Sequence, residues 1–161
     1  MNYVHNQDIQ GTGMAPASVG YSGPVIECQL SPGAKLPRRS HSTDAGADLF
    51  SYSAHEIYPG EQILIDTGIA VKIPVALAGF VYNRSSQGKR GIVIPNGVGV
   101  IDSGYRGNIM VLLKNISEDP YSICAGDRVA QLVIQPVVLA TFKDAWNDTT
   151  RGTGGFGSTG Q

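Results

Sequence analysis

The sequence predicts an all-β domain, a sandwich or barrel of short strands. From Val25 onward, short apolar segments alternate with turn residues at intervals of roughly 8–12 residues, which is typical of that class. The 21 glycines and nine prolines among 161 residues imply many turns and count against a helical bundle. No long window of the sequence repeats apolar residues with a 3.6-residue period.

The predicted strands, in chain order, are Val25–Leu30, Asp48–Tyr52, Gln62–Asp66, Ile69–Ile73, Gly79–Val81, Ile92–Ile94, Asn108–Lys114, Arg128–Ile134 and Val137–Phe142. The segment "IAVKI" has the alternation of a half-buried strand. Its apolar side chains recur at every second position from Ile69 to Ile73, and Lys72 would face the opposite side.

Turn signals separate these segments. Proline, glycine and acidic residues cluster in "YPGE" (58–61), "ISEDP" (116–120) and "AGDR" (125–128). The only helix that we expect is about two turns after Ser85, in "SSQGKR", where the glycine weakens it.

The length, net charge and cysteine content of the chain indicate which partners and which cellular compartment to expect. A length of 161 residues suits one domain, and a net charge of −1 provides no basic field for nucleic acid or an anionic membrane. Residues 1–24 are expected to be a poorly ordered extension without a signal peptide or membrane anchor. Cys28 and Cys124 lack zinc-ligand spacing, so we expect reduced thiols in a cytoplasmic compartment.

Two internal polar segments could bind a ligand. In "YNRSSQGKRG" (82–91), Arg84 and two serine hydroxyls leave a strand together, which suits phosphate, although a solvated basic turn is the simpler interpretation of this segment alone. In "PNGVGVIDSGYRGN" (95–108), Asp102 could act as a general base or could only cap its turn. Arg128 and Gln131 interrupt an otherwise apolar strand, where they could be ordinary solvated groups or functional ones. In "STDAGADLFS" (42–51), Asp44 and Asp48 bracket a glycine, and the segment could be only a turn that enters a strand.

The C-terminal segment "RGTGGFGSTGQ" (151–161) matches two nucleotide motifs superficially. It fits GxGxxG, but no strand precedes it and no helix follows it, and Ser158 stands where a P-loop has lysine. Composition alone favours a disordered tail. A glycine-rich backbone can nevertheless turn many N–H groups toward phosphate oxygens.

Taken in order, "AGADLFS", "RSS", "GVGVIDSGYRGN", "RVAQLVI" and "RGTGGFGSTG" resemble the five motifs of the homotrimeric dUTPases. The resemblance implies a jelly-roll-like β barrel over residues 25–142 and a C-terminal arm over residues 143–161 that closes on substrate. It also implies a homotrimer whose active sites each combine motifs of three subunits. The implied reaction is hydrolysis of dUTP to dUMP and pyrophosphate, by attack of water on the α-phosphorus.

The resemblance also assigns roles to individual residues. Asp102 matches the general base, Tyr105 matches the ring that packs on deoxyribose and excludes a 2′-hydroxyl, and Asp48 and Arg128 match supporting positions. The implied substrate-binding residues are Arg84, Ser85, Ser86, Asn96, Gly99, Val100, Ile101, Tyr105, Gln131, Arg151, Phe156, Gly157 and Ser158. Mg²⁺ is implied as a cofactor held by the substrate's phosphates and by water, without a protein ligand.

The sequence departs from the family pattern at two positions near these motifs. Asn83 stands where many members have proline, and Asn108 stands where glutamate or glutamine is common. Two other interpretations remain open at this point. One is a dCTP deaminase, possibly bifunctional, which shares the barrel and trimer, and the other is a trimeric nucleotide-binding regulatory protein.

Overall fold

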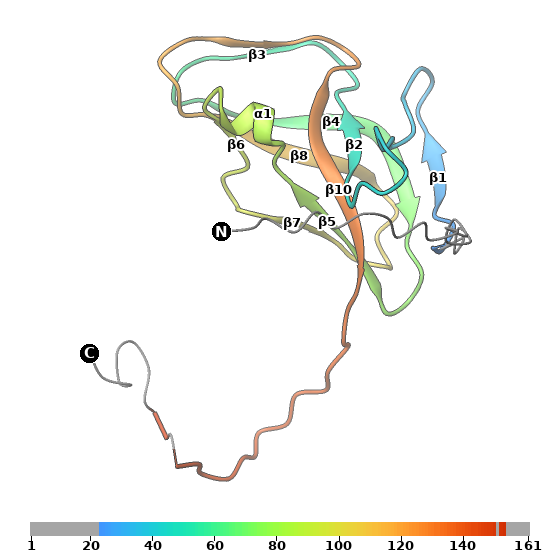
Figure 1. Ribbon diagram of the computed structural model, residues 1–161, viewed down its shortest axis with the longest axis vertical. Helices are drawn as coiled ribbons and strands as arrows, with labels where there is room; N and C mark the ends of the chain where they lie inside the picture. Colours follow the sequence, from blue (N-terminus) through green and yellow to red (C-terminus); the bar gives the residue numbers. More distant parts are fainter. Residues whose placement is uncertain (1–22, 151, 154–161) are drawn as a thin grey trace, which may run out of the picture.

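Three antiparallel sheets make up the protein, whose computed structural model describes residues 23–150 and 152–153. The first sheet has the order β1-β4-β8-β6, the second β2-β10-β5-β7, and the third pairs β3 with β9. In Figure 1, β10 and β5 cross in front of β4 and β8. The strands are β1 (Glu27–Leu30), β2 (Ala47–Phe50), β3 (His55–Ile57), β4 (Gln62–Lys72), β5 (Leu77–Tyr82), β6 (Ile92–Val93), β7 (Gly99–Ile101), β8 (Asn108–Asn115), β9 (Tyr121–Ile123) and β10 (Arg128–Pro136).

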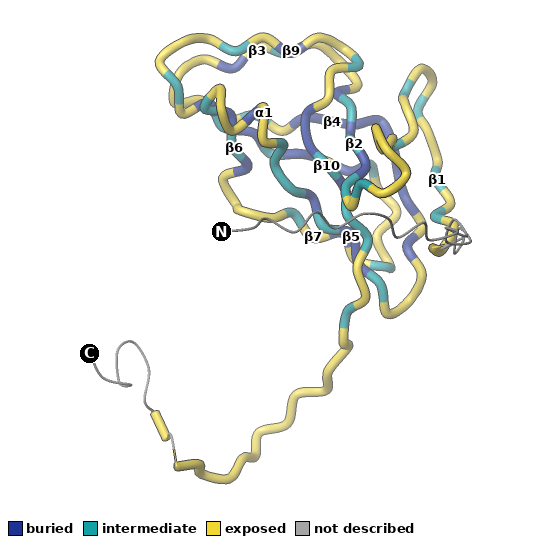
Figure 2. The backbone as a smooth tube through the Cα atoms, in the orientation of Figure 1, coloured by how far each residue is buried: buried dark blue, intermediate teal, exposed yellow. Residues whose placement is uncertain are grey.

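The core lies between the two larger sheets, and Figure 2 shows their central strands as the buried part of the chain. Strand β8 shows how the alternation forms it: Ile109, Val111 and Leu113 are buried, whereas Met110 between them is exposed. Each such aliphatic side chain stabilises the fold by about 1.5–3 kcal/mol when it leaves water. The prediction of an all-β fold is therefore confirmed.

The predicted break between two strands at residues 66–69 is wrong, because β4 continues through it. The predicted strands Gln62–Asp66 and Ile69–Ile73 are one strand, whose pairing with β8 shifts register between Asp66 and Ala70. Gly68 adopts a φ of +68° inside this irregularity, a conformation that glycine reaches without steric cost. The bulge interrupts the apolar alternation, so the sequence alone predicts a break between two strands there.

Other differences concern short or unpaired segments. Residues 137–142 form no strand but leave the barrel, with Val138 and Phe142 92% and 95% exposed (Figure 1). Strands β3, β7 and β9 were not predicted, because three residues are too few to show a period. The predicted two-turn helix is the shorter α1 (Ser85–Gly88).

The cysteines and the length of the helices bear on two predictions made from the sequence. Cys28 and Cys124 are free thiols, as expected. Within the described residues, the structure contains no helix with the length and apolar character needed to span a membrane.

Candidate active site

A polar pocket of about 350 Å³ opens where β10 lies between β2 and β5. We call it the arginine pocket. Gln131 of β10 pairs across the sheet with both Asp48 of β2 and Tyr82 of β5, so three strands place their side chains around one point. The pocket is lined by Ser40, Asp44, Ala45, Gly46, Asp48, Arg84, Ser85, Ser86, Arg128 and Gln131.

Asp48 organises the cations of the arginine pocket. Its Oδ1 accepts a hydrogen bond from Arg84 Nε at 2.8 Å, and its Oδ2 accepts one from Arg128 Nη1 at 3.3 Å. The side chains of Asp48 and Arg84 are only 16% and 19% exposed, so water screens this pair less than a surface pair. One carboxylate thus holds two guanidinium groups, and this trio keeps an excess positive charge.

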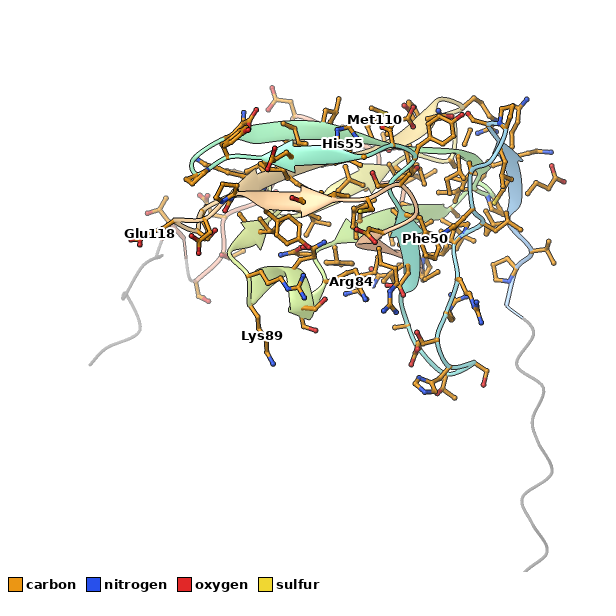
Figure 3. All side chains as sticks on the ribbon, turned by 90° about the horizontal axis from the view of Figure 1, so that it is seen from above. Phe50, His55, Arg84, Lys89, Met110 and Glu118 are labelled. Carbon is orange, nitrogen blue, oxygen red and sulfur yellow. The ribbon has the colours of Figure 1, made fainter. Side chains whose placement is uncertain are left out.

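Arg84 is fixed by more than its ion pair. Its Nη1 donates to the Arg128 carbonyl at 3.2 Å and to Ser86 Oγ at 3.3 Å. Figure 3 shows Arg84 between Lys89, directly after α1, and Phe50 on β2. A guanidinium carries five N–H donors in a rigid fork, so the remaining N–H groups are oriented for an anion.

A second layer of hydrogen bonds supports the segment that carries Arg84. Asn83 Oδ1 accepts the Arg84 N–H at 3.0 Å, and Asn83 Nδ2 donates to the Ile92 carbonyl at 2.9 Å. Gln131 Nε2 donates to the Asn83 carbonyl at 3.0 Å. The buried Gln87 Nε2 donates to the Arg128 carbonyl at 3.2 Å. These contacts tie the start of α1 to β6 and β10.

The loop before β2 forms another wall of the arginine pocket. Gly46 packs so closely on Gln131 that a Cβ at position 46 would collide with Gln131 Oε1. Asp44 accepts the His41 N–H at 2.8 Å, and this hydrogen bond lowers the pKa of the Asp44 carboxyl. Ser40, Asp44, Ala45 and Gly46 were not among the predicted site residues, although the last three belong to segment 42–51, which the sequence analysis singled out.

The predicted residues of segment 95–108 form a separate group around β7. Asn96 lies in a turn in which Gly97 has a φ of +75° and donates its N–H to the Ile94 carbonyl at 3.0 Å. Strand β7 then carries Gly99, Val100 and Ile101 along β5. The exposed Asp102 follows, and its carbonyl accepts the Tyr105 N–H at 3.1 Å. The Tyr105 ring is 41% exposed.

The structure keeps these two groups apart within one chain. Ile101 pairs with Gly79, which lies five positions before Arg84 in an extended segment. At about 3.3 Å per residue, Asp102 and Arg84 are separated by on the order of 15–20 Å. Accordingly, Asn96, Asp102 and Tyr105 do not line the arginine pocket, whereas Asp48, Arg84, Ser85, Ser86, Arg128 and Gln131 do. Arg151, Phe156, Gly157 and Ser158 lie outside the described residues.

Comparisons with known proteins point to one family. A family model described as dUTPase matches residues 33–160. The deoxyuridine 5′-triphosphate nucleotidohydrolase of Rhodococcus erythropolis is 46% identical over 138 residues, which are 82% of this chain and 83% of the relative. The protein of the same name from Mycolicibacterium gilvum is 43% identical over 141 residues, which are 82% of this chain and 92% of the relative.

Solved structures agree with the sequence relatives. The Staphylococcus bacteriophage 80alpha dUTPase with dUPNHPP superposes with a TM-score of 0.76 at 31% identity, covering 86% of this chain and 100% of that chain. A mutant dUTPase from phage phi11 of S. aureus, described with a structural Mg(II) ion, gives a TM-score of 0.71 at 30% identity. It covers 77% of this chain and 98% of that chain.

Proposed function

This chain belongs to the dUTPase family, and on this premise we propose how it hydrolyses dUTP to dUMP and pyrophosphate. In the proposed site, Arg84, Ser85 and Ser86 of one chain bind the phosphates. Asp102 of a second chain accepts a proton from the water that attacks the α-phosphorus. A carboxylate within hydrogen-bond reach of the attacking water can take its proton as the bond to phosphorus forms.

The proposal rests on the pairing of Ile101 with Gly79, which separates two half-sites within one chain, the arginine pocket and the group around Asp102. A general base must lie within about 2.6–3.2 Å of the water that it deprotonates. Arg84 must be similarly close to a phosphate oxygen of the same substrate. A separation on the order of 15–20 Å along β5 makes it difficult for one chain to satisfy both requirements. A homotrimer with shared active sites brings the arginine pocket of one chain to the Asp102 of another.

The segment after β10 supports such an assembly. Val138, Phe142 and Trp146 are 92%, 95% and 93% exposed, so the part of their own chain that the structure describes leaves them uncovered. Large apolar side chains gathered on one exposed segment are typical of a surface that contacts another protein. We propose that this segment crosses to a neighbouring subunit. Residues 151–161 would then close over the bound nucleotide, with Arg151 at the γ-phosphate, Phe156 on uracil, and Gly157 and Ser158 at the phosphates.

In the proposed site, segment 95–108 selects the base and the sugar of the substrate. Asn96 and the backbone of Gly99, Val100 and Ile101 would pair with the edge of uracil, and Gln131 would reach the base through water. Cytosine would leave buried donors and acceptors without partners, a loss that produces strong discrimination. The Tyr105 ring would pack on deoxyribose and leave no room for a 2′-hydroxyl.

Mg²⁺ would enter the arginine pocket together with the triphosphate, because Asp48, Arg84 and Arg128 offer one carboxylate and carry an excess positive charge. Within the described residues, no three His, Cys, Asp or Glu side chains form a metal-binding group, and Mg²⁺ commonly keeps waters and binds substrate phosphates instead of an all-protein cage. When bound, Mg²⁺ neutralises charge on the triphosphate. The partly buried Asp48 would accept hydrogen bonds from the ion's water shell while it holds Arg84 and Arg128.

A turnover assay with dUTP, dCTP, dTTP and UTP in the presence of Mg²⁺ tests the proposal. We expect pyrophosphate from dUTP alone, and Asp102→Asn should abolish most of it. Release at the parental rate from Asp102→Asn would refute the general-base assignment. Ammonia released from dCTP would instead indicate the deaminase interpretation.

A further inference from the structure

The hydroxyl end of Tyr105 is anchored by its own loop. Tyr105 Oη donates a hydrogen bond to the Asn108 carbonyl at 2.9 Å. The ring also lies directly over Gly107, where a Cβ would come within 2.5 Å of Tyr105 Oη and 2.8 Å of Cζ. Any larger residue at position 107 would therefore displace the ring. The ring is held at one edge and remains 41% exposed.

The Asn108 side chain connects this loop to β4. Its Nδ2 lies 3.1 Å from each carboxylate oxygen of Asp66, and this contact is partly buried. Asp66 Oδ1 also accepts the Gly68 N–H at 2.7 Å, inside the irregularity of β4. One carboxylate thus fixes both the bulge of β4 and the first residue of β8.

Other bonds hold the remainder of the loop. The buried Thr67 Oγ1 donates to the Ile109 carbonyl at 2.7 Å, which ties the start of β8 to β4 a second time. Arg106 Nη1 donates to the carbonyls of Ser103 and Tyr105 at 2.8 and 2.7 Å. Because the backbone on both sides of Tyr105 is fixed, the ring position follows from where Asn108 places its carbonyl.

We propose that Asn108, held by Asp66, is a positioning residue that sets the preference for deoxyribose over ribose. The inference rests on the proposed function, in which the Tyr105 ring faces the sugar. Steric rejection of one hydroxyl requires a ring that cannot retreat, because a small displacement makes room for the extra oxygen. The Asp66–Asn108 contact supplies that rigidity from outside the substrate pocket.

Exchanging the two side chains provides a sharp test. Asn108→Asp alone places two carboxylates together, and we expect the ratio of kcat/KM for dUTP to that for UTP to fall about tenfold. In the double variant Asp66→Asn/Asn108→Asp, the amide nitrogen introduced at position 66 can donate to the carboxylate introduced at position 108, while the amide oxygen still accepts the Gly68 N–H. The exchange should restore the ratio to within about threefold of the parent. The exposed Gln62→Glu, also on β4, controls for the carboxylate that Asn108→Asp adds.

Tyr105→Phe keeps the test decisive if Asn108→Asp fails to fold. It removes only the hydroxyl that Asn108 anchors, and we expect it to lower the dUTP/UTP ratio several-fold with the ring still present. An unchanged ratio in Tyr105→Phe, or in a folded Asn108→Asp, would overturn the proposal. A parent protein that does not hydrolyse dUTP would refute the proposed function itself, which is a separate result.

Discussion

Arg84 donates its Nε–H to Asp48 Oδ1 at 2.8 Å, although the two residues are far apart in the sequence. Arg84 follows β5 and Asp48 lies in β2, and β10 is the strand between β5 and β2. The sheet therefore brings together side chains of β2, of β10 and of the segment that follows β5. Preorganised cations cost little reorganisation when charge develops on a phosphoryl group.

The first prediction concerns the carboxylate of this pair. Asp48→Asn removes the charge that holds Arg84 and Arg128, so their donors should lose their fixed orientation. We expect kcat/KM for dUTP to fall at least about tenfold, equivalent to about 1.4 kcal/mol. Steady-state pyrophosphate release measures the effect. Hydrogen bonds to charged groups are worth about 1.5–3 kcal/mol, so the free energy of unfolding should fall as well.

A surface ion pair provides the matched control for Asp48→Asn. Glu27 accepts from Lys72 Nζ at 2.8 Å, but both side chains are mostly exposed. Glu27→Gln should change the free energy of unfolding by less than about 1 kcal/mol and leave kcat/KM unchanged. Equal effects of the two substitutions would show that the Asp48 pair has no special role.

The second prediction concerns Gly46. A Cβ at this position would collide with Gln131 Oε1, so Gly46→Ala should push the Gln131 amide away from the Asn83 carbonyl. Overpacking of this kind costs typically about 1–3 kcal/mol. We expect thermal unfolding at a lower temperature and a raised KM for dUTP, because Asn83 leads directly into Arg84. Gly60 has a φ of +79° and no atom near an added Cβ, so Gly60→Ala controls for the backbone cost of losing a glycine. It should lower the unfolding temperature but leave KM unchanged.

The third prediction tests shared active sites. Asp102→Asn and Arg84→Ala should each be inactive as pure proteins, because each lacks one half-site. When the two are unfolded together and refolded, some mixed trimers contain a site with an intact Asp102 from one chain and an intact Arg84 from another. We expect part of the parental activity to return. Mixed assemblies, verified by two affinity tags, that stay as inactive as the pure variants would place both half-sites in one chain.

The order of the five motifs predicted Asp102 and Arg84 as site residues, because residue type and spacing are local properties. It did not predict how far apart the two residues lie in one chain. Their separation depends on the register Gly79–Ile101 across β5 and β7, and β7 was too short to be predicted. Residues 137–142 were wrongly predicted as a strand, because apolar alternation shows that a segment needs cover but not that its own chain provides it.

The fourth prediction concerns the glycine-rich end of the chain. Stopping the chain after Thr150 removes "RGTGGFGSTGQ" but none of the strands that the structure describes, the last of which is β10. The truncated protein should therefore keep the unfolding temperature and oligomeric state of the parent. Its turnover of dUTP should fall at least about tenfold, or about 1.4 kcal/mol in the barrier, because the proposed closure over substrate would exclude water and complete the phosphate contacts. Phe156→Ala in the full chain separates uracil stacking from phosphate binding and should raise KM more than it lowers kcat. A truncated protein with the parental rate would mean that residues 151–161 take no part in catalysis.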